Sequence, residues 1–73
     1  MSNDIKKEMR TRAKLSKGLA NALQYDVSYI CSDVDSCDVM CLGESIRDTK
    51  DTLQKLLDNV TELEYLLYLM KKD

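Results

Sequence analysis

A seven-residue repeat of apolar side chains in residues 46–70 constrains the fold of this chain more than any other feature of its sequence. At alternating spacings of three and four, the segment places Ile46, Thr49, Leu53, Leu56, Val60, Leu63, Leu67 and Met70. This spacing forms a single stripe along a helix, with Thr49 as its one polar member. A lone helix has nothing against which to bury such a stripe, so another segment or another chain must cover it.

A second repeat of the same kind precedes it. Its members are apolar or small with few exceptions: Met9, Ala13, Ser16, Ala20, Leu23, Val27, Ile30, Val34, Cys37 and Cys41. This pattern predicts a first helix over about residues 4–41. Gly18 lies inside it, and because glycine is costly in a helix interior we expect a possible break there.

Residues 25–41 also permit another interpretation. Tyr25, Val27, Tyr29 and Cys31 alternate in the manner of a strand, and so do Cys37, Val39 and Cys41. A β-hairpin with its loop at 32–36 is therefore an alternative to helix in this segment. A lone two-stranded ribbon is only marginally stable, however, and the continuous helical repeat favours helix.

The reversal between the two helices is predicted at residues 42–44, because Gly43 is the residue type that commonly follows a helix end. Ser45 then caps a second helix that runs to about residue 72. Folded in this way, residues 1–73 form a single all-α domain, a long antiparallel helical hairpin resembling a coiled coil. The first helix would be the longer, so residues before about 15 would overhang without a partner.

Charge divides this chain of net charge −2 into two parts. Residues 1–18 carry six basic and two acidic residues, a net +4, whereas residues 19–73 carry five basic and eleven acidic residues, a net −6. The basic residues of this arm are Lys6, Lys7, Arg10, Arg12, Lys14 and Lys17. Such an arm can neutralise phosphates or contact an acidic protein, and the sequence leaves both alternatives open.

The end of the second helix carries more apolar surface than one partner helix can cover. Residues 63–70 are apolar nearly all round the helix, which is typical of a segment buried on several sides. We therefore predict further association, as a dimeric four-helix bundle or by docking on a partner. The residues expected to form that interface are Tyr65, Leu66, Tyr68 and Leu69.

No arrangement of residues in the sequence indicates catalysis. The chain has no histidine, no glycine-rich phosphate loop and no nucleophile beside a plausible base, so we expect no enzyme activity, cofactor or small-molecule substrate. Asp33, Asp35 and Glu44 match part of a calcium loop, but Cys37 and Cys41 occupy other ligand positions and argue against it. We expect no metal site, and we expect Cys31, Cys37 and Cys41 to serve as small buried apolar residues.

The sequence also has no recognisable leader, and its longest apolar run is too short to cross a membrane, which predicts a cytoplasmic protein without membrane contact. Taken together, these features predict a non-enzymatic protein–protein interaction module, such as a small adaptor, inhibitor or chaperone-like regulator. It would bind a protein partner or its own copy through helix packing. The alternative is a nucleic-acid-binding regulator that uses the basic arm.

Overall fold

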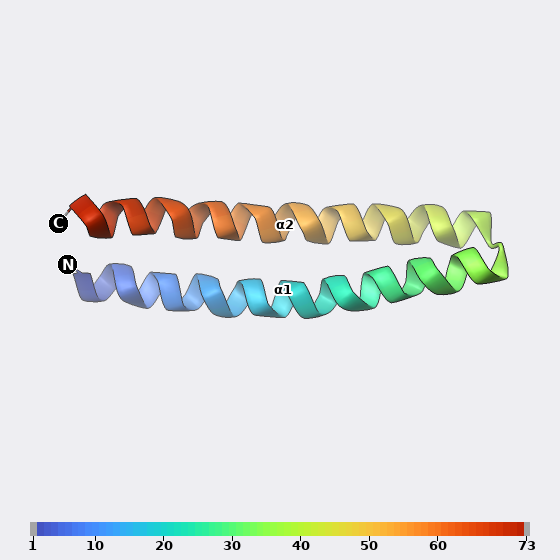
Figure 1. Ribbon diagram of the computed structural model, residues 1–73, viewed down its shortest axis with the longest axis horizontal. Coiled ribbons are helices and arrows are strands. Elements are labelled where there is room, and N and C mark those ends of the chain that lie inside the picture. Colours follow the sequence, from blue (N-terminus) through green and yellow to red (C-terminus); the bar gives the residue numbers. More distant parts are fainter. Residues whose placement is uncertain (1, 73) are drawn as a thin grey trace.

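The protein is a hairpin of two long helices that lie side by side (Figure 1). A computed structural model describes residues 2–72, with α1 over Ser2–Ser36 and α2 over Val39–Lys72. The hairpin is 54 Å long, and the start of α1 and the end of α2 lie at the end opposite the turn. The predicted all-helical hairpin is confirmed. The β-hairpin alternative is wrong, because α1 continues through residue 36 and residues 2–72 contain no strand.

The reversal occurs at Cys37 and Asp38, five residues before the predicted turn at 42–44. The backbone N–H of Cys37 donates to the carbonyl of Val34 at 3.2 Å, and that of Asp38 donates to the carbonyl of Asp33 at 3.1 Å. These two bonds form a Schellman ending, in which the residue just past the helix adopts a left-handed conformation. Cys37 takes that conformation, with φ of 56°, although glycine is the usual residue there.

Asp38 begins the second helix in the same step. Its carboxylate accepts the backbone N–H of Cys41 at 3.1 Å, and its carbonyl accepts the N–H of Leu42 at 2.9 Å. An aspartate at this position is a favoured helix N-cap, because it satisfies an N–H group that has no partner inside the helix. The cap therefore places the start of α2 directly after Asp38. Both Gly18 and Gly43 lie within unbroken helix.

This earlier turn makes the helices nearly equal, at 35 and 34 residues. The predicted N-terminal overhang is consequently wrong. The start of α1 lies beside the end of α2, where Met9 and Ala13 share a surface groove with Leu63, Leu67 and Met70.

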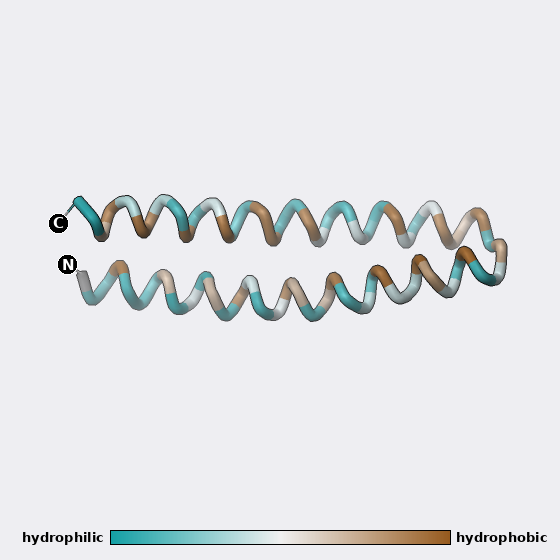
Figure 2. Tube along the Cα trace, in the orientation of Figure 1, coloured by the Kyte–Doolittle hydropathy of each residue, from teal (hydrophilic) through white to brown (hydrophobic). Residues whose placement is uncertain are grey.

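Burial repeats every seven residues on both helices and defines an inner layer between them. On α1 the inner layer consists of Ile5, Met9, Arg12, Ser16, Leu19, Leu23, Asp26, Ile30 and Asp33; on α2 it consists of Leu42, Ser45, Thr49, Thr52, Leu56, Asn59, Leu63, Leu66 and Met70. Glu62 and Leu69, each directly before a residue of this layer, are also half-buried. Hydrophobic and hydrophilic residues therefore alternate along both helices (Figure 2). Among the described residues Leu66 is the one apolar side chain that is buried, at 7% exposure.

Eight of the eighteen predicted contact residues belong to this layer, and eight others directly follow a residue of the layer. The residues predicted correctly are Met9, Ser16, Leu23, Ile30, Thr49, Leu56, Leu63 and Met70. These eight others are exposed, and a polar or at least equally large neighbour one position earlier faces the partner helix in the place of each. Of the remaining two, Cys37 lies in the turn, and Cys41 is exposed on the first turn of α2.

Candidate interaction surface

The displaced residues form a continuous strip along one side of the hairpin, which we call the apolar flank. It consists of Ala13, Ala20, Val27, Val34, Ile46, Leu53, Val60 and Leu67. Each follows directly after an inner-layer residue, and one step along a right-handed helix turns the side chain by about 100°. Because α1 and α2 run in opposite directions, these turns bring the flank residues of both helices to the same side.

Cross-helix hydrogen bonds fix which flank residues are neighbours. Asp33 and Ser45 are bonded, so the residues that follow them, Val34 and Ile46, lie at the same level. In the same way the bond between Asp26 and Thr52 places Val27 level with Leu53. The eight positions carry no charge.

The six larger side chains of the apolar flank are each between 43% and 54% exposed, so about half of each remains open to solvent in the hairpin. This leaves an apolar strip along most of the length of the hairpin. Contiguous apolar surface of this kind typically marks an interaction site.

Three polar pairs hold the inner layer in register. The Ser45 hydroxyl donates to the Asp33 carboxylate at 2.6 Å, and the Thr52 hydroxyl donates to the Asp26 carboxylate at 2.7 Å. Towards the open end, the Arg12 guanidinium donates to the Asn59 carbonyl oxygen at 3.0 Å. Each half-buried polar group thereby gains a partner that a shifted alignment of the helices would remove.

The structure divides the four residues predicted to form the partner interface. Tyr65 and Tyr68 are exposed, at 55% and 51%, and can contact a partner. Leu69 is half-buried. Leu66 faces α1 and is the most buried apolar residue of the hairpin, so it stabilises the hairpin and is not accessible on its surface.

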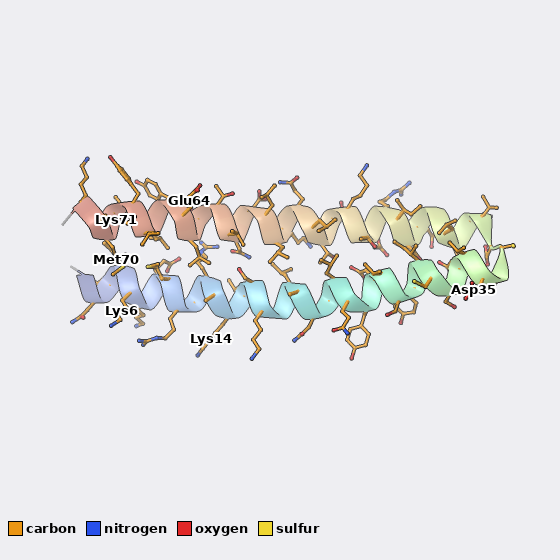
Figure 3. The ribbon with its side chains drawn as sticks, in the orientation of Figure 1. Lys6, Lys14, Asp35, Glu64, Met70 and Lys71 are labelled. Carbon is orange, nitrogen blue, oxygen red and sulfur yellow. The ribbon has the colours of Figure 1, made fainter. Side chains whose placement is uncertain are left out.

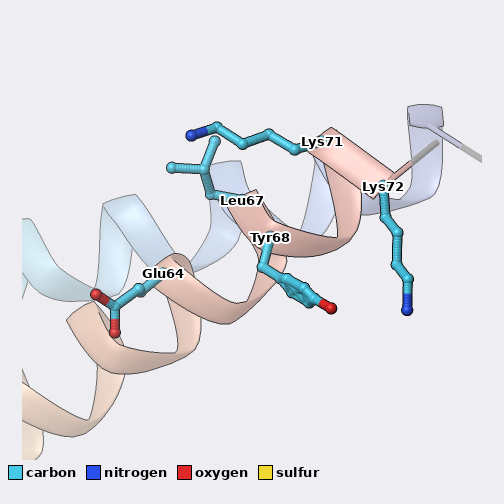
Figure 4. Close-up of a pocket in the computed structure, with 5 residues that line it drawn as sticks. All are labelled: Glu64, Leu67, Tyr68, Lys71 and Lys72. Atoms are coloured by element: carbon cyan, nitrogen blue, oxygen red, sulfur yellow. The ribbon is translucent and has the colours of Figure 1, made fainter.

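A shallow hollow next to Tyr68 joins this region to the apolar flank (Figure 4). Its lining residues are Glu64, Leu67, Tyr68, Lys71 and Lys72. The Lys72 ammonium lies 5.5 Å from the centre of the Tyr68 ring, within the range of a cation–π contact. Leu67 lines both this hollow and the groove that contains Met9, so the apolar flank reaches the open end of the hairpin.

The basic arm lies along the first half of α1 and faces several directions. Lys14 points away from α2, whereas Met70 points towards α1 (Figure 3). Lys6 and Arg10 border the groove beside Leu67. Arg12 belongs to the inner layer, where it pairs with Glu8 at 3.1 Å as well as with Asn59. Arg12 is thus half-buried at the contact with α2, while the other five cations are exposed.

All three cysteines are exposed, which contradicts their predicted role as buried apolar residues. They lie at or near the turn, because the chain reverses at residues 37–38. A hydrogen bond to the Asp38 carboxylate raises the pKa of the Cys41 thiol, so this thiol is less ionised than usual. The same cap lowers the pKa of Asp38, chiefly because the Cys41 N–H donates to its carboxylate.

Asp33 and Asp35, two of the calcium-loop candidates, lie on α1, and Glu44 lies on α2. Asp33 accepts the Ser45 hydroxyl. Within residues 2–72, no three potential metal-binding side chains gather closely enough to hold an ion.

Comparison with known proteins gives no relative: no family model, no curated protein and no solved structure matches the chain. Neither α1 nor α2 is apolar over a sufficient length to span a membrane. The surface itself is therefore the basis for assigning a function.

Proposed function

We propose that the protein is a non-enzymatic interaction module that binds its partner through helix packing. The observation that carries this proposal is the contrast between its interior and its surface. One apolar residue is buried among those described, whereas the apolar flank leaves six larger aliphatic side chains about half exposed. A chain this short gains little stability from such an interior and gains more by covering the flank.

The exposed aromatic residues support the same proposal. Tyr65 and Tyr68 lie on α2 close to the end of the apolar flank, and tyrosine is enriched at protein interfaces because it combines a large apolar ring with a polar tip. We assign the primary contact to the apolar flank and a peripheral contact to these two tyrosines.

Site-specific photo-crosslinking in the cells that produce the protein tests this function. A photoreactive residue at Leu53, in the middle of the apolar flank, should give discrete protein adducts. The same residue at Tyr25, which is exposed and lies outside the flank, should give few. If positions 53, 60 and 68 all fail to give protein adducts, the proposed function is wrong.

A second candidate function, nucleic-acid binding, is favoured by one specific observation. The hairpin brings Lys71 and Lys72 to the same end as the basic arm, so residues 2–18 and 58–72 together carry eight basic and five acidic residues. Phosphate contacts weaken steeply as salt rises. Fluorescence anisotropy with a labelled duplex and a single strand should therefore detect salt-sensitive binding, and no binding to either at low salt excludes this candidate.

A further inference from the structure

We propose that the apolar flank is the contact between two copies of this chain, which pack as an antiparallel four-helix bundle with the turn of each hairpin beside the open end of the other. This inference rests on the proposed interaction function and names the partner. Four observations support a second copy: the direction of the apolar stripe, the distribution of charge, the sizes of the flank side chains and the area of the hairpin face.

The direction of the stripe favours a bundle over a simple pair of helices. On each helix the apolar stripe occupies two positions of the seven-residue repeat. One is the inner position at which Met9 and Leu23 lie, and the other is the flank position four residues later. At about 100° per residue, the middle of that stripe points about 50° away from the neighbouring helix, to the same side on both helices. In a square bundle of four helices the centre lies about 45° from the direction of each neighbour. Both stripes therefore point to where the centre of such a bundle would be.

The opposite side of the hairpin does not offer a comparable surface. The positions that precede the inner layer there include Glu8, Asp48, Lys55 and Glu62, which are charged. Burying these charges would be costly without a partner for each. The apolar flank has no such cost at any of its eight positions.

Charge decides the relative direction of the two copies. The half of the hairpin at the open end, residues 2–18 and 58–72, has a net charge of +3, and the half at the turn, residues 19–57, has seven acidic and three basic residues, a net −4. Parallel copies would place like charges together. Antiparallel copies place the basic end of each beside the acidic end of the other, which is the complementary arrangement.

Side-chain size agrees with this direction. The smallest side chains of the flank, Ala13 and Ala20, lie towards the open end. The larger Val27 and Val34 lie towards the turn. An antiparallel pair sets small levels against large ones, as close packing requires.

The face of the hairpin is large enough to accommodate an interface of standard size. From its Cα dimensions of 54 and 14 Å, the face of the hairpin covers about 750 Å² per copy, close to the roughly 800 Å² that each partner contributes to a standard interface. A second copy thus covers the flank along its whole length.

Sedimentation and light scattering of the full chain over a dilution series test the proposal. The expected mass is twice the 8.4 kDa of one chain. Leu53→Lys should raise the Kd roughly 100-fold or more, because two lysines would enter the apolar centre. Leu15→Lys is the matched control: Leu15 is 49% exposed and Leu53 is 47% exposed, but Leu15 lies outside the flank. A monomeric wild type, or equal dissociation by both variants, overturns the proposal.

A distance measurement keeps the test valid if Leu53→Lys fails to fold. A spin label at Met40→Cys, in a chain with Cys31→Ser, Cys37→Gly and Cys41→Ser, reports the position of the exposed turn end. In a 54 Å antiparallel dimer the two labels should lie about 45 Å apart. A distance below about 30 Å, the width expected of parallel copies, overturns the antiparallel arrangement.

The crosslinking at Leu53 separates failure of this inference from failure of the proposed function. A monomeric chain whose photoreactive Leu53 captures a different protein overturns the dimer and leaves the interaction function standing. A monomeric chain that captures no protein from the flank or from Tyr68 overturns both.

Discussion

The Thr52 hydroxyl donates a 2.7 Å hydrogen bond to the Asp26 carboxylate across the two helices, close to the middle of the hairpin. This pair belongs to the inner layer, and both residues are half-buried. Its consequence is that Val27 and Leu53, the next residues on each helix, are turned outward onto the apolar flank. A polar contact inside the hairpin thus determines which apolar residues are available to a partner.

Removing this bond should weaken the hairpin. Thr52→Val keeps the size of the side chain but leaves the half-buried Asp26 carboxylate without its donor, which should lower the free energy of unfolding by about 1–3 kcal/mol. Thr61→Val, at an exposed position of α2, is the control and should have little effect. Urea unfolding at fixed chain concentration measures both, and equal stability of the two variants would contradict the role given to the pair.

Replacing the two glycines should stabilise the protein. Both lie in helix interiors, and an added Cβ would meet no other atom within 4 Å at Gly18 or Gly43. Alanine is favoured over glycine there because it loses less backbone freedom, so Gly43→Ala should raise the free energy of unfolding by about 0.5–1 kcal/mol. Gly18→Ala should act similarly in the same urea titration. If Gly43 ended a helix in a left-handed conformation, alanine would instead destabilise.

Cys37→Gly makes the opposite exchange at the turn. Cys37 has φ of 56°, a conformation that suits glycine better than any residue with a Cβ. Glycine at position 37 should therefore raise the free energy of unfolding by about 0.5–1 kcal/mol. Were residue 37 inside a continuous first helix, the same substitution would cost about 1 kcal/mol, so thermal or urea unfolding decides between the two turns.

The two-helix hairpin and eight of the eighteen inner-layer residues could be predicted from the sequence, because the period of apolar residues is a property of each helix alone. The turn could not, since Gly43 is a stronger turn residue than Cys37 by propensity. The features that fix the turn are the Schellman ending of α1 and the Asp38 cap of α2. Once the turn moves, polar residues such as Asp33 and Ser45 meet in the inner layer.

The candidate site was missed for the same reason. Residues such as Val34 and Ile46 were identified as apolar contacts, but between the helices and not on the outer face. The available signal was that the Asp26 and Asp33 carboxylates can accept hydrogen bonds from hydroxyl groups on α2. Each of these aspartates is followed by a valine, which turns outward when the aspartate faces α2. Of the predicted interface, Tyr65 and Tyr68 remain accessible, and Leu66 belongs to the interior.

Asp38 should make stability depend on pH in the acidic range. The Cys41 N–H lowers the pKa of Asp38 in the folded state below its ordinary value of 3.8. Its stabilising contribution is therefore fully present above that value and is lost as pH falls through the lower, folded pKa. Thermal melts of Asp38→Asn, which can still cap the helix, should show a smaller acid-induced drop than wild type. Identical drops would contradict the capping role.

Cys41 should react slowly with thiol reagents because Asp38 raises its pKa and the thiolate is the reactive form. Asp38→Asn removes the negative charge and should accelerate alkylation of Cys41 at neutral pH. Cys31, which lies on α1 outside this contact, is the internal reference and should keep its rate. Peptide mapping after timed alkylation measures both, and an unchanged Cys41 rate would contradict the contact.

The alignment of the helices decides whether the apolar flank exists, and intrachain crosslinking measures it directly. In a chain with Cys31→Ser, Cys37→Gly and Cys41→Ser, the pair Asp26→Cys and Thr52→Cys should be joined within one molecule by a short bis-maleimide. If the chain instead turned at residues 42–44, position 26 would face residues 60–61, about 13 Å from position 52 along the helix. Efficient joining of positions 26 and 52 is the predicted result, and joining of Val27→Cys to Val60→Cys in its place would contradict the account.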